Sequence, residues 1–300
     1  MSRFYVGVFF ALASAAGFGL MPIFGLYAYV YNLGINTILF LRFAFAALVF
    51  FVYTFMRIKD GFLLSRFQFL ALFLLGGILY TAQAAFYFLA IRFIPASLTA
   101  LLIYTYPILV TILSAAVEKE KPSRQIIASI CVAFAGLILV LGTSFRSIDI
   151  RGVLSAFGAA TVYSVYIVLG NRVVKELHPV VMSAFVSLFA SLSFLCMGLV
   201  TSTLDFGFHP RAWLPIAGII VFSTLLAVFG FFRSLELIGS TRASILSMIE
   251  PLVTVGFAAL LFSERLSLTQ LLGGAGVLAG AMMLVLAQRS RTSKECNRAS

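Results

Sequence analysis

Residues 107–136, PILVTILSAAVEKEKPSRQIIASICVAFAG, return in outline as residues 251–280, PLVTVGFAALLFSERLSLTQLLGGAGVLAG. Each stretch holds two long apolar runs joined by a short charged hinge. An internal repeat of this kind predicts a chain built from two related halves. Five anchors keep their spacing at an offset of 144 positions (251 − 107 = 144), with Pro107, Glu120, Ser123, Ala135 and Gly136 matching Pro251, Glu264, Ser267, Ala279 and Gly280.

The composition places the chain in a bilayer. Of its 300 residues 62% are hydrophobic and only 10% are charged, whereas soluble domains are about half apolar and a quarter charged. Three cysteines and two histidines form no zinc or disulfide pattern, so we expect no metal and no cofactor. The net charge of +11 is spread over loops, which indicates membrane topology rather than binding of nucleic acid.

Apolar runs of about twenty residues predict an all-α integral membrane protein. The first run continues too far for a cleaved signal peptide, and its Gly7-Val8 matches the internal Gly152-Val153. We therefore count it as a retained span. We expect one repeat of five helices in residues 1–147, and a second in 148–300 with a short cytoplasmic tail. The ten expected helices cover residues 4–31, 36–56, 67–91, 94–117, 125–143, 152–173, 180–201, 212–233, 239–262 and 268–288.

The distribution of Lys and Arg predicts the direction of insertion. With the N-terminus inside, fifteen of these residues fall on the inner side, five on the outer side and one, Arg42, inside a helix. This bias predicts cytoplasmic termini. Because five spans is an odd number, the second repeat inserts upside down relative to the first, which predicts two inverted repeats.

The chain resembles the EamA-type family of the drug/metabolite transporter superfamily. The resemblance rests on residues 96–107 with Glu118-Lys-Glu120, on residues 240–251 with Ser263-Glu264-Arg265, and on Leu41-Arg42-Phe43. It covers nearly the whole chain and implies a fold and secondary transport, but no particular substrate. Relatives of this kind export amino acids and other small metabolites, or carry sugars, nucleotide sugars or triose phosphates.

Glu250 is the most informative polar side chain. It lies about eleven residues into the expected ninth helix, near the bilayer midplane, where a charge costs about 2.5–3.5 kcal/mol. Two interpretations remain open. Glu250 either couples protons or contacts a substrate amine, or it is a buried carboxylate that accepts hydrogen bonds where Pro251 disturbs the helix.

Polar and aromatic side chains at helical depth predict a cavity, with simple enrichment of tyrosine at membrane interfaces as the alternative. Tyr80, Gln83 and Tyr87 share one face of the third helix, since they recur at spacings of three and four. Together with Glu250, the expected substrate contacts are these three residues, Tyr104, Tyr106, Tyr163, Tyr166 and Ser247.

A second group has an expected gating or structural role. Arg42 lies near the outer end of helix two, where it can snorkel, and a pairing with Glu250 stays open. Arg233, Glu236 and Arg242 cluster at the hinge between helices eight and nine, with an ion pair expected between Arg233 and Glu236. Glu120 and Glu264 are expected to pin the two hinges, and Pro107 and Pro251 to kink helices four and nine.

These features favour a secondary transporter that exports small polar or amphipathic metabolites such as amino acids, with or without proton coupling. Import or exchange of sugars or sugar phosphates is the alternative. An intramembrane enzyme is disfavoured because no Asp and no His lies in an expected span, and no catalytic residues are assigned. The expected location is the plasma (inner) membrane, the expected partners are lipid and a small-molecule substrate, and the expected state is a monomer or weak homodimer.

Overall fold

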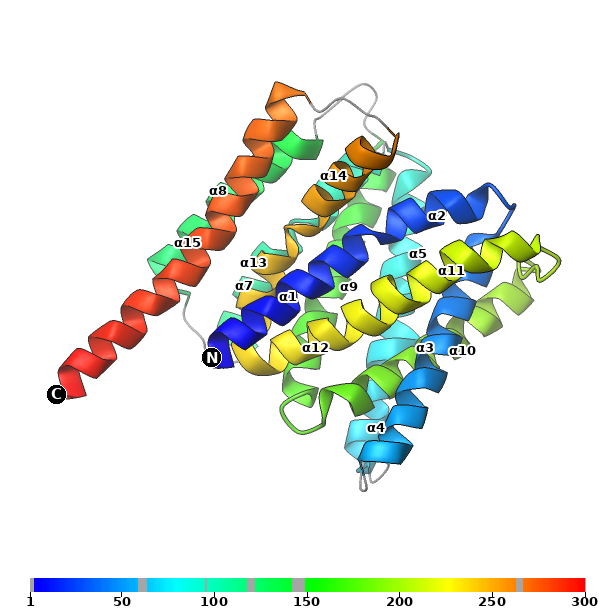
Figure 1. Ribbon diagram of the computed structural model, residues 1–300, viewed down its shortest axis with the longest axis horizontal. Coiled ribbons are helices and arrows are strands. Elements are labelled where there is room, and N and C mark those ends of the chain that lie inside the picture. Colours follow the sequence, from blue (N-terminus) through cyan, green and yellow to red (C-terminus); the bar gives the residue numbers. More distant parts are fainter. Residues whose placement is uncertain are drawn as a thin grey trace.

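A computed structural model describes residues 3–58, 64–94, 96–117, 122–141, 149–262 and 267–299. The described residues form a helical bundle (Figure 1). The first half comprises α1 Arg3–Gly19, α2 Met21–Tyr29, α3 Ile35–Arg57, α4 Arg66–Phe73, η1 Leu74–Leu79, α5 Tyr80–Ile91, α6 Ala96–Ile103, α7 Tyr106–Val117 and α8 Arg124–Leu141. The second half comprises α9 Ile150–Val173, α10 Pro179–Val200, η2 Pro210–Ala212, α11 Trp213–Ile220, η3 Val221–Leu226, α12 Ala227–Ile238, α13 Ser240–Ser247, α14 Glu250–Phe262 and α15 Leu268–Ala299.

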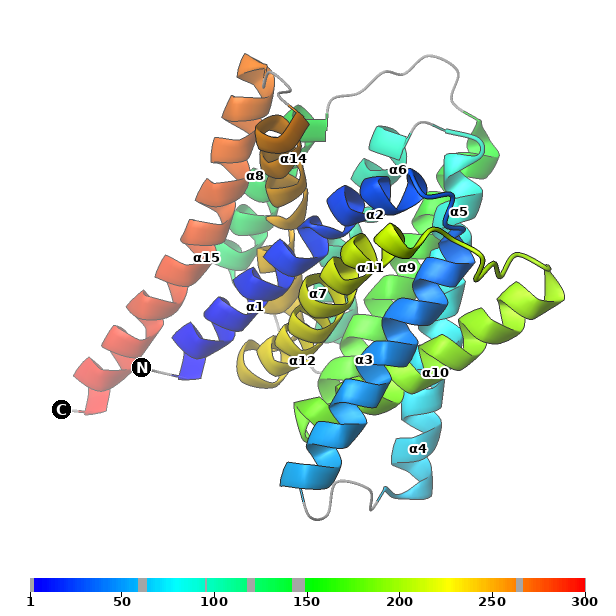
Figure 2. The ribbon, with the colours of Figure 1, turned by 45° about the vertical axis from the view of Figure 1, so that its right-hand side comes forward.

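These elements make up the predicted membrane spans. Nine continuous stretches of the described residues are long and apolar enough to cross a membrane, and Arg124–Val140 is a shorter apolar helix in the remaining position. The all-α membrane fold is therefore confirmed. Both ends of the chain lie toward the same end of the bundle in both ribbon views (Figure 2), as an even number of spans requires.

Side-chain caps explain one pair of repeat anchors. The Ser267 hydroxyl accepts the Gln270 N–H at 3.2 Å, and the Gln270 side chain accepts the Ser267 N–H at 2.9 Å. Ser123 likewise accepts the Ile126 N–H at 3.3 Å. Each serine thus satisfies a backbone donor in the first turn of the last helix of its half.

Two expected helix ends are wrong. The eighth span was expected to stop at residue 233, but α12 continues to Ile238, where Gly239 with a φ of +80° ends it. Helix α15 was expected to end at 288 before a polar tail, but it continues to Ala299. Polar residues such as those after Gln288 sustain a helix as readily as apolar ones do, so a hydropathy boundary did not predict the helix end.

The helices pack in pairs around one core. Helix α3 packs along α10, α1 along α12, and α5 along α9, while α8 and α15 lie together at one edge (Figures 1 and 2). The largest cluster of buried side chains draws from both halves, including Leu75, Tyr106, Ile167 and Phe232. The core therefore holds the two halves together rather than filling each separately.

Candidate functional site

The predicted kinks at Pro107 and Pro251 are present and match each other. Helix α6 ends at Ile103 and α7 begins at Tyr106, while α13 ends at Ser247 and α14 begins at Glu250. At each break the backbone switches to i→i−3 hydrogen bonds, Thr105 to Leu102 at 3.2 Å and Ile249 to Leu246 at 3.2 Å. A proline has no N–H to donate and its ring crowds the preceding turn. The sequence repeat therefore produces two equivalent discontinuous spans.

Glu250 lies directly after the second break. Its side chain is partly exposed, although it lies among helices of the core. The Tyr104 hydroxyl, next to the first break, is within hydrogen-bonding reach of the Glu250 carboxylate. No basic side chain of the described residues forms an ion pair with Glu250. The site is thus a carboxylate held by a neutral donor, and it retains capacity to bind a cation or a proton.

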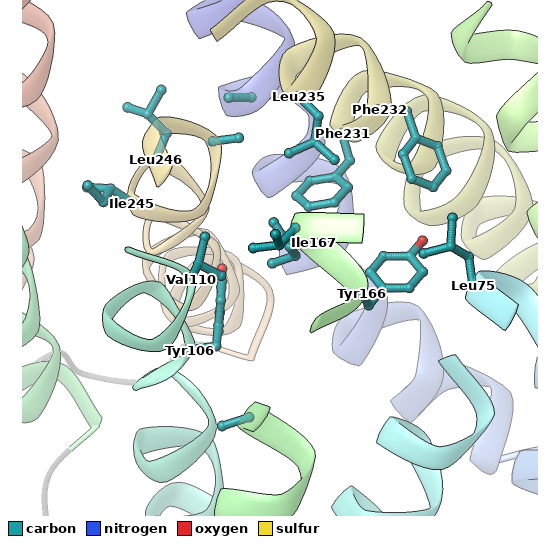
Figure 3. Packing of buried hydrophobic residues seen from close by; sticks show 14 of the residues in the cluster. Leu75, Tyr106, Val110, Tyr166, Ile167, Phe231, Phe232, Leu235, Ile245 and Leu246 are labelled. Carbon is teal, nitrogen blue, oxygen red and sulfur yellow. The ribbon is translucent and has the colours of Figure 1, made fainter. Parts of the chain in front are cut away.

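Tyr104, which lies beside Glu250, begins an unbroken series of tyrosine ring contacts. Tyr104 and Tyr106 have ring centroids 6.0 Å apart, Tyr106 and Tyr163 4.8 Å, Tyr163 and Tyr166 5.8 Å, and Tyr166 and Tyr80 6.1 Å. Tyr106 and Tyr166 belong to one packed cluster with Ile167, Leu75 and Phe232 (Figure 3). Edge-to-face and stacked rings of this kind form a rigid aromatic wall.

Exposure separates the wall into two groups. Tyr106 and Tyr166 are buried, at 2% and 5% exposure, and belong to the main core cluster. Tyr80, Tyr104 and Tyr163 remain partly exposed. Tyr87 is also partly exposed and lies within electrostatic range of Glu250.

Ser247 and Gln83, the remaining expected substrate contacts, differ in burial and in hydrogen bonding. Ser247 is buried, donates to the Ala243 carbonyl at 3.0 Å, and lies within hydrogen-bonding reach of Tyr106. Gln83 is partly exposed, and no hydrogen bond ties its amide to the part of the chain that the structure describes. That Gln83 contacts the substrate stays a prediction.

Arg42 does not snorkel. Its side chain is 1% exposed, and its guanidinium contacts the Thr224 hydroxyl at 3.2 Å, the Ser223 carbonyl at 3.2 Å and the Met21 sulfur. It also lies over the Phe43 ring. Within the described ranges Arg42 has no carboxylate partner, so the open pairing with Glu250 is not formed. The prediction that Arg42 snorkels is wrong because η3 places hydrogen-bond acceptors beside its guanidinium.

The cluster of Arg233, Glu236 and Arg242 lies only partly at the expected hinge. Arg233 and Glu236 form the expected ion pair, but both lie on α12 rather than in a loop. Arg242 contacts the Ile238 carbonyl at 3.4 Å. Glu120 and Glu264 lie outside the described residues. His178, which the sequence argument did not select, lies within electrostatic range of both Arg233 and Glu236.

His178 caps α10, since its ring nitrogen accepts the Val180 N–H at 3.3 Å. Burial lowers the pKa of His178 below its usual 6.5, and Arg233 lowers it further, while Glu236 partly opposes both. The folded state therefore favours the neutral ring. Its contribution to stability is present above pH 6.5 and is lost as the pH falls through the lowered pKa.

We expect the thermal midpoint to decrease as the pH is lowered from 7.5 to 5.5. The decrease should be smaller in His178→Asn, whose amide caps a helix without titrating. Thermal unfolding of both proteins in detergent over this range measures the difference. Equal pH dependence in the two proteins would show that another group is responsible.

Within the described residues, no group of three or more His, Cys, Asp or Glu side chains is placed to hold a metal ion.

The chain is similar to known transporters. It is 25% identical over 199 residues to the uncharacterized transporter YcbK of Bacillus subtilis, a match covering 63% of this chain and 64% of that one. It is 29% identical over 217 residues to the threonine/homoserine exporter RhtA of Salmonella typhimurium, covering 69% and 67%. One crystal structure has a TM-score of 0.77 at 19% identity, covering 95% of this chain and 98% of its own, which supports the fold alone.

The family model makes the assignment, because it matches the chain twice, as the repeat requires. The two matches cover residues 5–142 and 150–286, one in each half, and take in both proline breaks and the tyrosine series. The match describes transporters rather than enzymes, and the chain is a multi-pass membrane protein that belongs to the EamA-like transporter family.

Proposed function

We propose that this transporter exports small polar or amphipathic metabolites that carry an amine, amino acids among them, by alternating access in the plasma (inner) membrane. The termini face the cytoplasm in this proposal, because Lys and Arg are concentrated on that side. The two halves, divided near residues 147 and 148, supply the equivalent gates.

The observation that carries the proposal is the carboxylate of Glu250, which has no basic partner among the described residues and lies beside partly exposed tyrosines. A protonated amine gains a charge-assisted hydrogen bond from the carboxylate and cation–π attraction from the ring faces. Tyr104, Tyr163 and Tyr87 offer apolar surface with a hydroxyl at one end, which suits a metabolite with a short apolar body. The similarity to a threonine/homoserine exporter agrees with this substrate class.

Proton coupling follows from the same group. Glu250 has room for either a proton or a substrate amine, since no basic side chain of the described chain occupies it. If the proton and the substrate amine compete for this carboxylate, a proton that enters from outside releases the bound substrate. A substrate molecule that binds from inside displaces the proton. Antiport then needs no second site.

Anionic sugar phosphates fit this site poorly. Such a substrate needs a cation in the cavity, but Arg42 is buried against η3, and Arg92 is exposed just beyond α5. Glu250 itself repels a phosphate.

A substrate screen on purified, reconstituted protein tests the proposal. Thermal shift first ranks amino acids, matching amines without the carboxylate, matching acids without the amine, and sugar phosphates. Counterflow of radiolabelled threonine into proteoliposomes then measures competition. We expect compounds with an amine to compete and the acids and phosphates to fail. Competition by the phosphates alone would overturn the substrate class.

A further inference from the structure

The third and eighth spans each contain a π-helical segment in the middle. Segment η1 covers Leu74–Leu79 between α4 and α5, and η3 covers Val221–Leu226 between α11 and α12. Their starts and ends are separated by the same offset (221 − 74 = 147 and 226 − 79 = 147), close to that of the sequence repeat. Since π-helix accounts for well under about 1% of residues, two such segments at matching places belong to the repeated architecture.

Each π segment is bonded by the second span of the opposite half. Ser193 on α10 donates to the Gly77 carbonyl of η1 at 2.9 Å. Arg42 on α3 donates to the Ser223 carbonyl and the Thr224 hydroxyl of η3, both at 3.2 Å. Helices α3 and α10 pack along each other (Figure 2). The packed pair of α3 and α10 therefore contacts both π segments.

Close backbone contact with a helix of the opposite half also holds each π segment. A Cβ on Gly76 of η1 would lie 2.3 Å from the Val186 carbonyl of α10. A Cβ on Gly17 of α1 would lie 2.4 Å from the Phe222 carbonyl of η3. Only glycine permits these approaches, so each segment lies in direct backbone contact with the opposite half.

Unpaired polar atoms gather at the same places. Among the described residues, the buried hydroxyls of Ser223 in η3, Thr81 just after η1, and Ser187 beside the Gly76 contact have no hydrogen-bond partner. A buried hydroxyl without a partner is unfavourable.

We propose that η1 and η3 are paired hinges at which the third and eighth spans bend as the transporter alternates, and that Ser193 and Arg42 are positioning residues that hold them. A π turn replaces the i→i−4 bond with a longer i→i−5 bond, which weakens the ladder locally and marks many functional bends. Arg42 should hold its segment more strongly than Ser193 does, because breaking the contacts of Arg42 leaves a buried cation without compensation.

Hydrogen exchange on the full-length protein in nanodiscs tests this with two crossed variants and needs no substrate. We expect Arg42→Gln to speed amide exchange about tenfold in residues 221–226 and to leave 74–79 within about twofold. We expect Ser193→Ala to speed amide exchange in residues 74–79, by a smaller factor, and to leave residues 221–226 within about twofold. Each segment is thus the control for the other variant. Equal acceleration in both segments, or none in either, would overturn the assignment of Arg42 and Ser193 as positioning residues.

Bending is measured separately with spin labels in a background without cysteine. Labels at Phe67→Cys and Ile91→Cys flank η1, and labels at Ile150→Cys and Val165→Cys lie on the uninterrupted α9. We expect a broader distance distribution across η1 than along α9, broader still in Ser193→Ala. Equally narrow distributions would exclude a hinge, and neither result depends on which metabolite is carried.

Discussion

Replacing Glu250 with glutamine is expected to remove the stimulation of uptake by a pH gradient and to lower amine-dependent transport about 10- to 100-fold. The amide keeps the size of the side chain but cannot carry a proton or a negative charge. A hydrogen bond to a charged group contributes about 1.5–3 kcal/mol, which corresponds to this range. Exchange of substrate without a gradient should be less affected than gradient-driven uptake, since exchange needs no proton cycle.

The measurement is uptake into proteoliposomes with and without an imposed pH gradient. Glu176→Gln makes the same chemical change at an exposed residue after α9 and should leave both rates within about twofold. Glu250→Asp retains the charge on a shorter side chain, so gradient dependence should survive at a reduced rate. Gradient-driven uptake that is unchanged in Glu250→Gln would exclude this carboxylate as the coupling group.

Tyr104 gives a graded version of the same test. Its hydroxyl is within reach of the carboxylate, so Tyr104→Phe removes one donor and keeps the ring. The ring contact with Tyr106, whose centroid is 6.0 Å away, should persist.

The membrane spans were predictable because each is decided by local composition. Twenty apolar residues satisfy a bilayer wherever they occur in a chain, and Pro107 and Pro251 break helices for reasons contained in the proline ring. Ser123 and Ser267 could be recognised as anchors from their spacing, and their role as caps agrees with that.

The features that were missed depend on tertiary contacts. Arg42 is buried because the eighth span supplies a carbonyl and a hydroxyl from 181 and 182 positions away, and no local pattern contains that information. The π segments leave no hydropathy signal. Gly76 and Gly77 were the available hint at η1, but η3 has no glycine. The continuation of α12 to Ile238 follows from Gly239, a signal that a hydropathy window passes over.

The largest effect on stability is expected from Gly136→Leu, at the contact between α8 and α15. A Cβ at residue 136 would lie 2.5 Å from both the Gly273 carbonyl oxygen and the Val277 nitrogen. These are backbone atoms of the opposite helix, so no side-chain rotation can relieve the overlap, and the helices must separate. We expect destabilisation at or above the upper end of the range of about 1–3 kcal/mol found for overpacked cores, measured as thermal midpoint and monodisperse yield in detergent.

Gly256→Leu is the matched control, because nothing lies within 4 Å of a Cβ at that helical position. It should be neutral or slightly stabilising, since replacing an open helical glycine improves helix propensity. Similar losses of stability in both variants would mean that close approach at Gly136 is not what joins the two helices.

The repeat extends this prediction to a second position. Gly280, the counterpart of Gly136, lies against Ala133 of α8 in the same contact. Because glycine stands at both repeat positions, α8 and α15 can cross backbone to backbone, and a large residue at either one should drive them apart.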